Sequence, residues 1–147
     1  MPLGQNPPSQ LRVVAAMLRV VIVDDDATVL RSFKRALMVR RPTWVVTTLP
    51  GSAEAIEHLA ANECEVFVTD YEMPEVNGVE LLCKVRDLWP TVRRVILSGK
   101  PADLVDFTPQ NLVQAWVRKA WGADELIAVV EDLVAAPTTR EDQQGIL

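Results

Sequence analysis

The sequence is poor in the cysteine and histidine that build disulfide frameworks and metal-thiolate centres, and it has no long apolar run. It contains two cysteines, Cys64 and Cys83, and one histidine, His58, in 147 residues. The spacing of the cysteines matches no metal-binding or redox motif, so we expect reduced thiols and a cytoplasmic protein. No apolar run approaches the roughly 20 residues that a membrane span requires, and we expect neither a membrane segment nor a signal peptide.

An excess of positive charge is also missing, because the formal net charge is -5. Proteins that contact nucleic-acid phosphates use clustered lysine and arginine, so we expect no direct nucleic-acid binding. The one basic stretch, residues 31–41, is spread over an expected helix and is typical of a solvated helix face. Length and a hydrophobic fraction of 49% predict one domain over 17–136, with a flexible extension at 1–16 and a polar, disordered tail at 137–147.

Strand and helix signals alternate five times along the chain. Residues 18–23 form a continuous apolar run, as expected of a strand buried on both faces. Asp26 and Ser52 are expected to cap the first two helices, the first of which ends before Pro42. Further strands are expected at 43–49, 65–69, 92–97 and 114–118, and further helices at 79–89, 101–112 and 123–134. This alternation predicts an α/β fold, a doubly wound five-stranded parallel sheet with helices on both faces.

Polar side chains follow four of the expected strands. Asp24, Asp25 and Asp26 follow the first strand, Asp70 the third, Ser98 the fourth and Lys119 the fifth. Parallel strands end at one edge of the sheet, where ligands bind in such folds. Clustered carboxylates repel one another, and Mg²⁺, which prefers oxygen ligands, is the natural cation to neutralise them and bridge a phosphoryl group. Asp70 is a candidate nucleophile, and Lys119 and Ser98 are candidates to contact the transferred oxygens.

These segments resemble the response regulator receiver family over residues 18–134. Residues 21–25, VIVDD, are similar to its acidic pair, and Asp70 to Gly78 matches its phosphoacceptor pattern Asp-x-x-Met-Pro-x-x-x-Gly. Residues 96–99, ILSG, are similar to its hydroxyl and small-residue site, and Lys119 matches its lysine. Each piece is weak alone, whereas all four in order, each at a strand end, form a specific signature.

The resemblance implies a flavodoxin-like receiver domain that works as a phosphorylation-dependent switch of a two-component system. A histidine kinase or histidine phosphotransfer protein would phosphorylate Asp70 to an aspartyl phosphate. The domain would be no enzyme beyond assisting its own phosphorylation and dephosphorylation. Mg²⁺ would be held by Asp25, Asp70 and the backbone carbonyl of Glu72, with Asp24 acting mostly through water.

The resemblance also implies an output mechanism. Ser98 and Trp116 would be the switch residues, with the indole either swinging from a solvent-facing rotamer or already packed. An unknown downstream protein would bind the face formed by 101–112, 114–118 and 123–134. The sequence leaves open whether the domain forms a homodimer. No output domain is recognised after the last helix, so a stand-alone receiver is expected.

The sequence departs from the family pattern beside the lysine. Ala120 stands where proline is usual, and we expect a trans Lys119–Ala120 bond, because a cis bond before a residue other than proline costs about 2.5–4 kcal/mol. Trp116 is larger than the usual tyrosine or phenylalanine of the switch position. Pro101 and Pro109 weaken the helix expected at 101–112.

Two other functions stay open. Residues 24–28, DDDAT, also resemble the nucleophile motif of haloacid-dehalogenase-type phosphatases, with Asp24 and Asp26 as its acids. Such enzymes need a pair of acids at a later strand end, whereas the acids after Lys119 fall on the last expected helix. The second alternative is a pseudo-receiver that binds partners without phosphorylation. The complete set of site residues argues against it, whereas Ala120 and the weakened helix at 101–112 keep it open.

Overall fold

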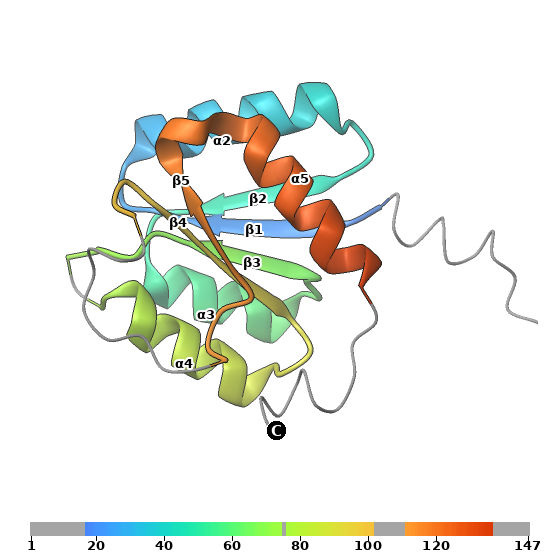
Figure 1. The fold of residues 1–147 in the computed structure, drawn as a ribbon. Coiled ribbons are helices and arrows are strands. Elements are labelled where there is room, and N and C mark those ends of the chain that lie inside the picture. Colours follow the sequence, from blue (N-terminus) through green and yellow to red (C-terminus); the bar gives the residue numbers. More distant parts are fainter. Residues whose placement is uncertain (1–16, 75, 102–110, 137–147) are drawn as a thin grey trace, which may run out of the picture.

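The computed structural model describes residues 17–74, 76–101 and 111–136, which form a parallel sheet between two layers of helices (Figure 1). The strands are β1 (Arg19–Val23), β2 (Val45–Leu49), β3 (Val66–Thr69), β4 (Arg93–Ser98) and β5 (Ala115–Arg118). The helices are α2 (Ala27–Arg40), α3 (Ser52–Ala61), α4 (Gly78–Leu88) and α5 (Gly122–Ala135), with a 3-10 turn η2 (Lys119–Trp121) before α5. The expected fold class is confirmed. The expectations for residues 1–16, most of 101–112 and 137–147 lie outside the described residues.

The order of the strands creates a crevice at one edge of the sheet. The order is β2-β1-β3-β4-β5, so the chain passes from β1 to one neighbour and then crosses to the other side of β1. Val23 pairs with Thr69 at the carboxyl ends of β1 and β3. Ligands of doubly wound sheets bind where the order reverses in this way. Asp24 and Asp70 are the residues that follow these two strands.

Alternation along β1 divides the core into two layers. Val20 and Ile22 pack with α2 and α5 on one face, whereas Val21 and Val23 pack with α3 and α4 on the other. All four side chains are at most 1% exposed. Because successive side chains of a strand point to opposite faces, an uninterrupted apolar run is what a strand covered on both sides requires.

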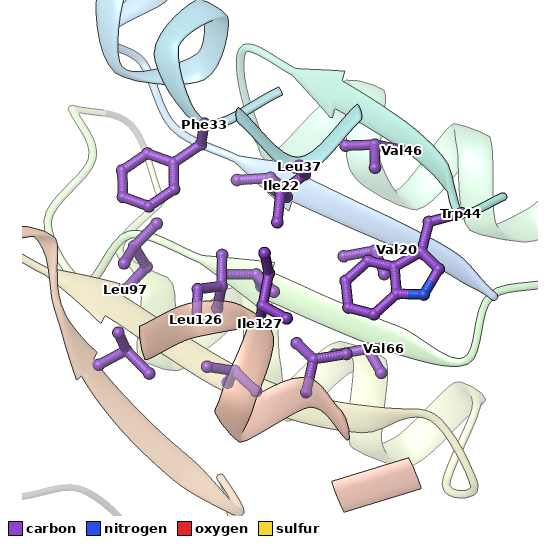
Figure 2. Close-up of a cluster of buried hydrophobic side chains, with 14 of the residues drawn as sticks. Val20, Ile22, Phe33, Leu37, Trp44, Val46, Val66, Leu97, Leu126 and Ile127 are labelled. Atoms are coloured by element: carbon purple, nitrogen blue, oxygen red, sulfur yellow. The ribbon is translucent and has the colours of Figure 1, made fainter. Parts of the chain in front are cut away.

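Burial of apolar side chains holds α2 and α5 against the sheet. Leu37 of α2 and Leu126 of α5 belong to the same cluster of apolar side chains over the strands, and both are completely buried (Figure 2). Fully burying one such side chain contributes roughly 1.5–3 kcal/mol. The ion pairs between α2 and α5 are exposed, and exposed pairs contribute about 0–1 kcal/mol. Packing therefore dominates the attachment of these helices. No helix among the described residues is long and apolar enough to cross a membrane.

One of the two expected helix caps is found. The Asp26 carboxylate accepts two backbone N–H groups of the first turn of α2, at 2.9 and 3.3 Å, and this confirms Asp26 as the N-cap. Ser52 does not cap α3, because it is the first helical residue and Gly51 occupies the N-cap position without a side-chain hydrogen bond. The helix extends one residue further than the capping preference of serine indicated.

Most other element boundaries differ from expectation by one or two residues, and local hydrogen bonds explain two of them. The strand expected at 43–49 begins at Val45, because the Trp44 N–H turns back to the Arg41 carbonyl at 3.0 Å. The helix expected at 79–89 begins at Gly78, because the side-chain oxygen of Asn77 caps it. Local hydrogen bonds, rather than the apolar pattern, decide where both elements begin.

The two hydrogen bonds of Asp26 predict a loss of stability in Asp26→Ala. Replacing an N-cap aspartate by alanine typically costs about 1 kcal/mol, and we expect the free energy of unfolding in urea to fall by about that amount. Asp26→Asn is the matched control, since asparagine caps as well as aspartate and should keep most of the stability. An equal fall in both variants would contradict a capping role.

Candidate functional site

Three carboxylates meet in the crevice beyond β1 and β3. Asp24, Asp25 and Asp70 each place an oxygen within 4.8 Å of the others. Asp24 is 1% exposed and Asp70 is 8% exposed, whereas Asp25 faces solvent. Negative charges so close together repel one another, so positive charge nearby stabilises the cluster.

Lys119 brings positive charge to the carboxylates from the end of β5. Its Nζ lies 2.7 Å from Asp24 Oδ2 and 3.4 Å from Asp70 Oδ1. Burial lowers the pKa of Lys119, but the hydrogen bonds and charges of Asp24 and Asp70 outweigh burial and raise this pKa above its ordinary value. The ammonium group therefore stays charged at neutral pH, and it joins the ends of three strands.

Asp24 offers an oxygen suited to a cation. Its Oδ1 accepts the backbone N–H of Asp26 at 2.9 Å. Its Oδ2 is buried, and the Lys119 ammonium at 2.7 Å is its ion-pair partner. A carboxylate oxygen with unused lone pairs, beside two more carboxylates, fits a hard cation or a water bound to one.

Ionisation of Asp70 at neutral pH costs free energy in the folded protein. Its pKa is raised to about 6, first by burial and then by the charge of Asp24. Lys119 and the Tyr71 N–H, which donates to Asp70 Oδ1 at 2.9 Å, lower the pKa without cancelling the rise. A bound cation, or a reaction that uses the charged oxygen, relieves this cost.

Gly78 allows the chain to pass close behind Asp70. A Cβ atom at this position would lie 2.2 Å from the Asp70 backbone oxygen, well inside contact distance. The Gly78 N–H also donates to the Tyr71 carbonyl at 2.8 Å, which closes the loop between β3 and α4. Any side chain here would displace the backbone that carries Asp70. The last position of the pattern Asp-x-x-Met-Pro-x-x-x-Gly is thus glycine because no larger residue fits there.

Ser98 lies at the end of β4, as expected, and is 3% exposed. Its hydroxyl oxygen accepts the backbone N–H of Lys100 at 3.0 Å. The Lys100 ammonium in turn donates to the Glu72 carboxylate at 2.7 Å and links the loops after β3 and β4. The sequence singled out Glu72 only for its backbone carbonyl. The ion pair joins two loops, and loop residues show no repeating pattern of polar and apolar positions, so the sequence does not predict this contact.

Trp116 is packed against its neighbours. The indole N–H donates to the Lys100 carbonyl at 2.9 Å, and the ring centroid lies 5.6 Å from that of Tyr71. The ring is half-buried and in contact with Tyr71, whereas the sequence left open whether it faces solvent or is packed. Lys119 and Ala120 are joined by a trans bond, as expected, since the described residues contain no cis peptide.

Comparison with known proteins identifies the family. Residues 20–131 match the model of the response regulator receiver domain, and the chain belongs to this family. The hydrogenase transcriptional regulatory protein HoxA of Cupriavidus necator is 29% identical over 129 residues, which is 86% of this chain and 26% of HoxA. The DNA-binding transcriptional regulator NtrC of Escherichia coli K12 is 28% identical over 117 residues, 79% of this chain and 24% of NtrC. The chain spans about a quarter of the length of these relatives.

A solved structure agrees on the fold. The response regulator TrrA of Thermotoga maritima, in complex with Mg²⁺ and BeF, superposes with a TM-score of 0.71 at 22% identity, over 80% of this chain and 99% of that one. The chain is thus a receiver domain of two-component response regulators, which are phosphorylation-dependent switches. Neither the phosphatase nor the pseudo-receiver alternative is favoured by these findings.

The raised pKa of Asp70 predicts a pH-dependent cost to stability in metal-free solution. Between the ordinary pKa of 3.8 and the folded value of about 6, the folded state holds a proton that the unfolded state releases, so stability falls as pH rises. Asp70→Asn removes this cost. We expect its free energy of unfolding, measured with a chelator present, to exceed that of wild type at pH 7 by more than at pH 4.

Asp132→Asn is the matched control for this measurement, because Asp132 is an exposed carboxylate on α5. Its difference from wild type should show no rise through pH 6. A difference between Asp70→Asn and wild type that does not change with pH would contradict the raised pKa of Asp70.

Proposed function

We propose that this chain accepts a phosphoryl group on Asp70 from a histidine kinase or a histidine phosphotransfer protein. The observation that carries the proposal is the placement of Asp70 between Asp24 and Lys119 at the reversal of strand order. A buried carboxylate beside an ammonium group has what an oxygen nucleophile needs to react with a phosphoryl group, namely ionisation and a nearby positive charge.

The cofactor of this proposal is Mg²⁺. Asp25, Asp70 and the backbone carbonyl of Glu72 would hold the ion, and Asp24 would act mostly through a bound water. The cluster of three carboxylates supports this donor set, since Mg²⁺ prefers oxygen ligands and usually keeps several waters. When bound, the ion supplies positive charge that holds the Asp70 carboxylate and the phosphoryl oxygens together.

In the transfer step, an Asp70 oxygen forms a bond to phosphorus and the phosphorus–nitrogen bond of the donor phosphohistidine breaks. The donor imidazole leaves with the electron pair and takes up a proton. Lys119, already within 3.4 Å of Asp70, contacts an oxygen of the transferred group, as does the Ser98 hydroxyl. The same residues assist hydrolysis of the aspartyl phosphate, and no other enzymatic activity is proposed.

The output of the proposed switch runs through the backbone of Lys100. Ser98 accepts its N–H, and Trp116 donates to its carbonyl, so a Ser98 that moves toward phosphate displaces the partner of Trp116. A downstream protein would then recognise β5 and α5, together with the segment 101–112, most of which lies outside the described residues.

We expect Mg²⁺-dependent phosphorylation of wild type by acetyl phosphate. Intact mass should rise by one phosphoryl group, and Asp70→Asn should abolish the rise. Asp25→Ala should require more Mg²⁺ for the same labelling, whereas Asp26→Ala, the neighbouring cap residue, should not. Transfer from phosphorylated histidine kinases of the source organism then tests the donor.

Two outcomes of the labelling experiment contradict the proposal. An unchanged wild-type mass would support a pseudo-receiver. Labelling that survives Asp70→Asn and disappears in Asp24→Asn would support the phosphatase-type nucleophile.

Trp116 should report the switch by fluorescence. Beryllofluoride, which mimics the phosphoryl group, is expected to change the emission of wild type beyond the effect of Mg²⁺ alone, because the indole hydrogen bond to Lys100 is disturbed. Trp116→Phe should lose this extra change. Trp121→Phe, which removes the exposed tryptophan beside Lys119, is the matched control and should keep it. Identical changes in wild type and Trp116→Phe would exclude Trp116 as the moving residue.

A further inference from the structure

A groove with an apolar floor lies between α2 and β2, on the side of α2 away from the α2–α5 contact. Its volume is about 620 Å³. Leu30, Met38 and Val39 provide apolar lining, and Thr48 contributes from β2. Met38 is 50% exposed and Val39 is 75% exposed. Large apolar side chains gathered in an open groove indicate a binding surface for a protein, a membrane or a ligand.

The groove is surrounded by positive charge. Arg31, Lys34 and Arg35 line it, and α2 contains no acidic residue. Within the described parts of the chain none of these three residues forms an ion pair, whereas Arg40, further along α2, pairs with Asp124 of α5. The whole chain has a net charge of -5, so this local excess of positive charge runs against the overall balance. It would attract an acidic partner.

β2 forms the edge of the sheet beside this groove. The Val45 N–H donates to the Leu18 carbonyl at 2.7 Å, on the side of β1. Because successive residues of a strand turn their backbone groups to opposite sides, those of Val46 and Thr48 point outward from the sheet. β2 contains neither lysine nor proline, the residues that commonly protect an edge strand. Thr48 also lines the groove, so edge and groove are continuous.

We propose that this groove and the edge of β2 bind an extended acidic segment of a partner protein. Added outside β2, the segment would form main-chain hydrogen bonds with Val46 and Thr48, and every second side chain would point toward α2. An apolar side chain on that face would contact Met38, and an acidic one would pair with Lys34 or Arg35. This surface is separate from the crevice of Asp70 and does not depend on phosphorylation.

The properties of the groove favour a protein segment over other occupants. A second copy joined through β2 would bring two positively charged surfaces together, which costs free energy. A nucleic acid would match the positive charge, but it would leave the apolar floor and the outward backbone groups without partners. An extended acidic peptide with apolar side chains satisfies all three features.

The probe is an array of fluorescein-labelled short peptides in which glutamate is combined with leucine, isoleucine, valine or phenylalanine in varied order. We expect members of the array to bind wild type saturably in fluorescence polarisation. Lys34→Glu should weaken the best binders by at least about tenfold, which corresponds to about 1.4 kcal/mol. Lys84→Glu, the same change of charge on α4, is the matched control and should leave binding nearly unchanged. Thermal unfolding verifies that both variants fold.

Strand addition is tested with the best peptide in two N-methylated forms, methylated on one or the other set of alternate residues. One form should lose binding and the other should keep it, because only every second N–H faces β2. The proposal is overturned if no peptide saturates, if both lysine variants weaken binding equally, or if neither methylated form differs from the parent. A dimer in sedimentation that Lys34→Glu dissociates would assign the groove to a second copy, and would overturn the proposal too.

Discussion

The contact of Lys119 with Asp24 and Asp70 is the interaction on which the rest of the crevice depends. It brings the ends of β1, β3 and β5 together and places positive charge beside Asp70, whose pKa is raised by burial and by the charge of Asp24. Buried ion pairs seldom add net stability, since desolvation offsets most of the attraction. The cluster therefore lowers the free energy of unfolding, and burial in the two apolar layers of the core offsets this loss. Its role is chemical rather than structural.

A buried cation, Arg94, fixes the start of β5, the strand that carries Trp116 and precedes Lys119. Arg94 of β4 is 1% exposed, and its guanidinium donates to the carbonyls of Leu112 at 2.7 Å and Val92 at 2.8 Å. Burial lowers its pKa, and backbone carbonyls supply the acceptors that it needs. This network attaches the chain entering β5 to β4. It holds the start of β5 in position, and Lys100 connects the loop beyond Ser98 to Trp116 through their hydrogen bonds.

Much of this organisation could be predicted from particular residues. The apolar run of β1 indicated a strand covered on both faces, and the hydrogen-bonding preference of Asp26 indicated a cap, because both signals are local. The prediction that Ser52 caps α3 was wrong, because serine favours the N-cap position but is also acceptable inside the first turn of a helix. Arg94 was missed because nothing in the sequence distinguishes an arginine that donates to buried carbonyls from one on the surface.

The sequence by itself determined the parallel α/β fold and the residue types at each strand end, since apolar alternation and polar strand-end residues are features of neighbouring positions. Only the tertiary structure decided which of those residues meet. The crossing from β1 to β3 brings Asp24 beside Asp70, and the Lys119 side chain reaches both from β5. The contacts of Trp116 with the Tyr71 ring and the Lys100 carbonyl are likewise tertiary. Such contacts depend on strand order and on space between distant segments, which no local pattern encodes.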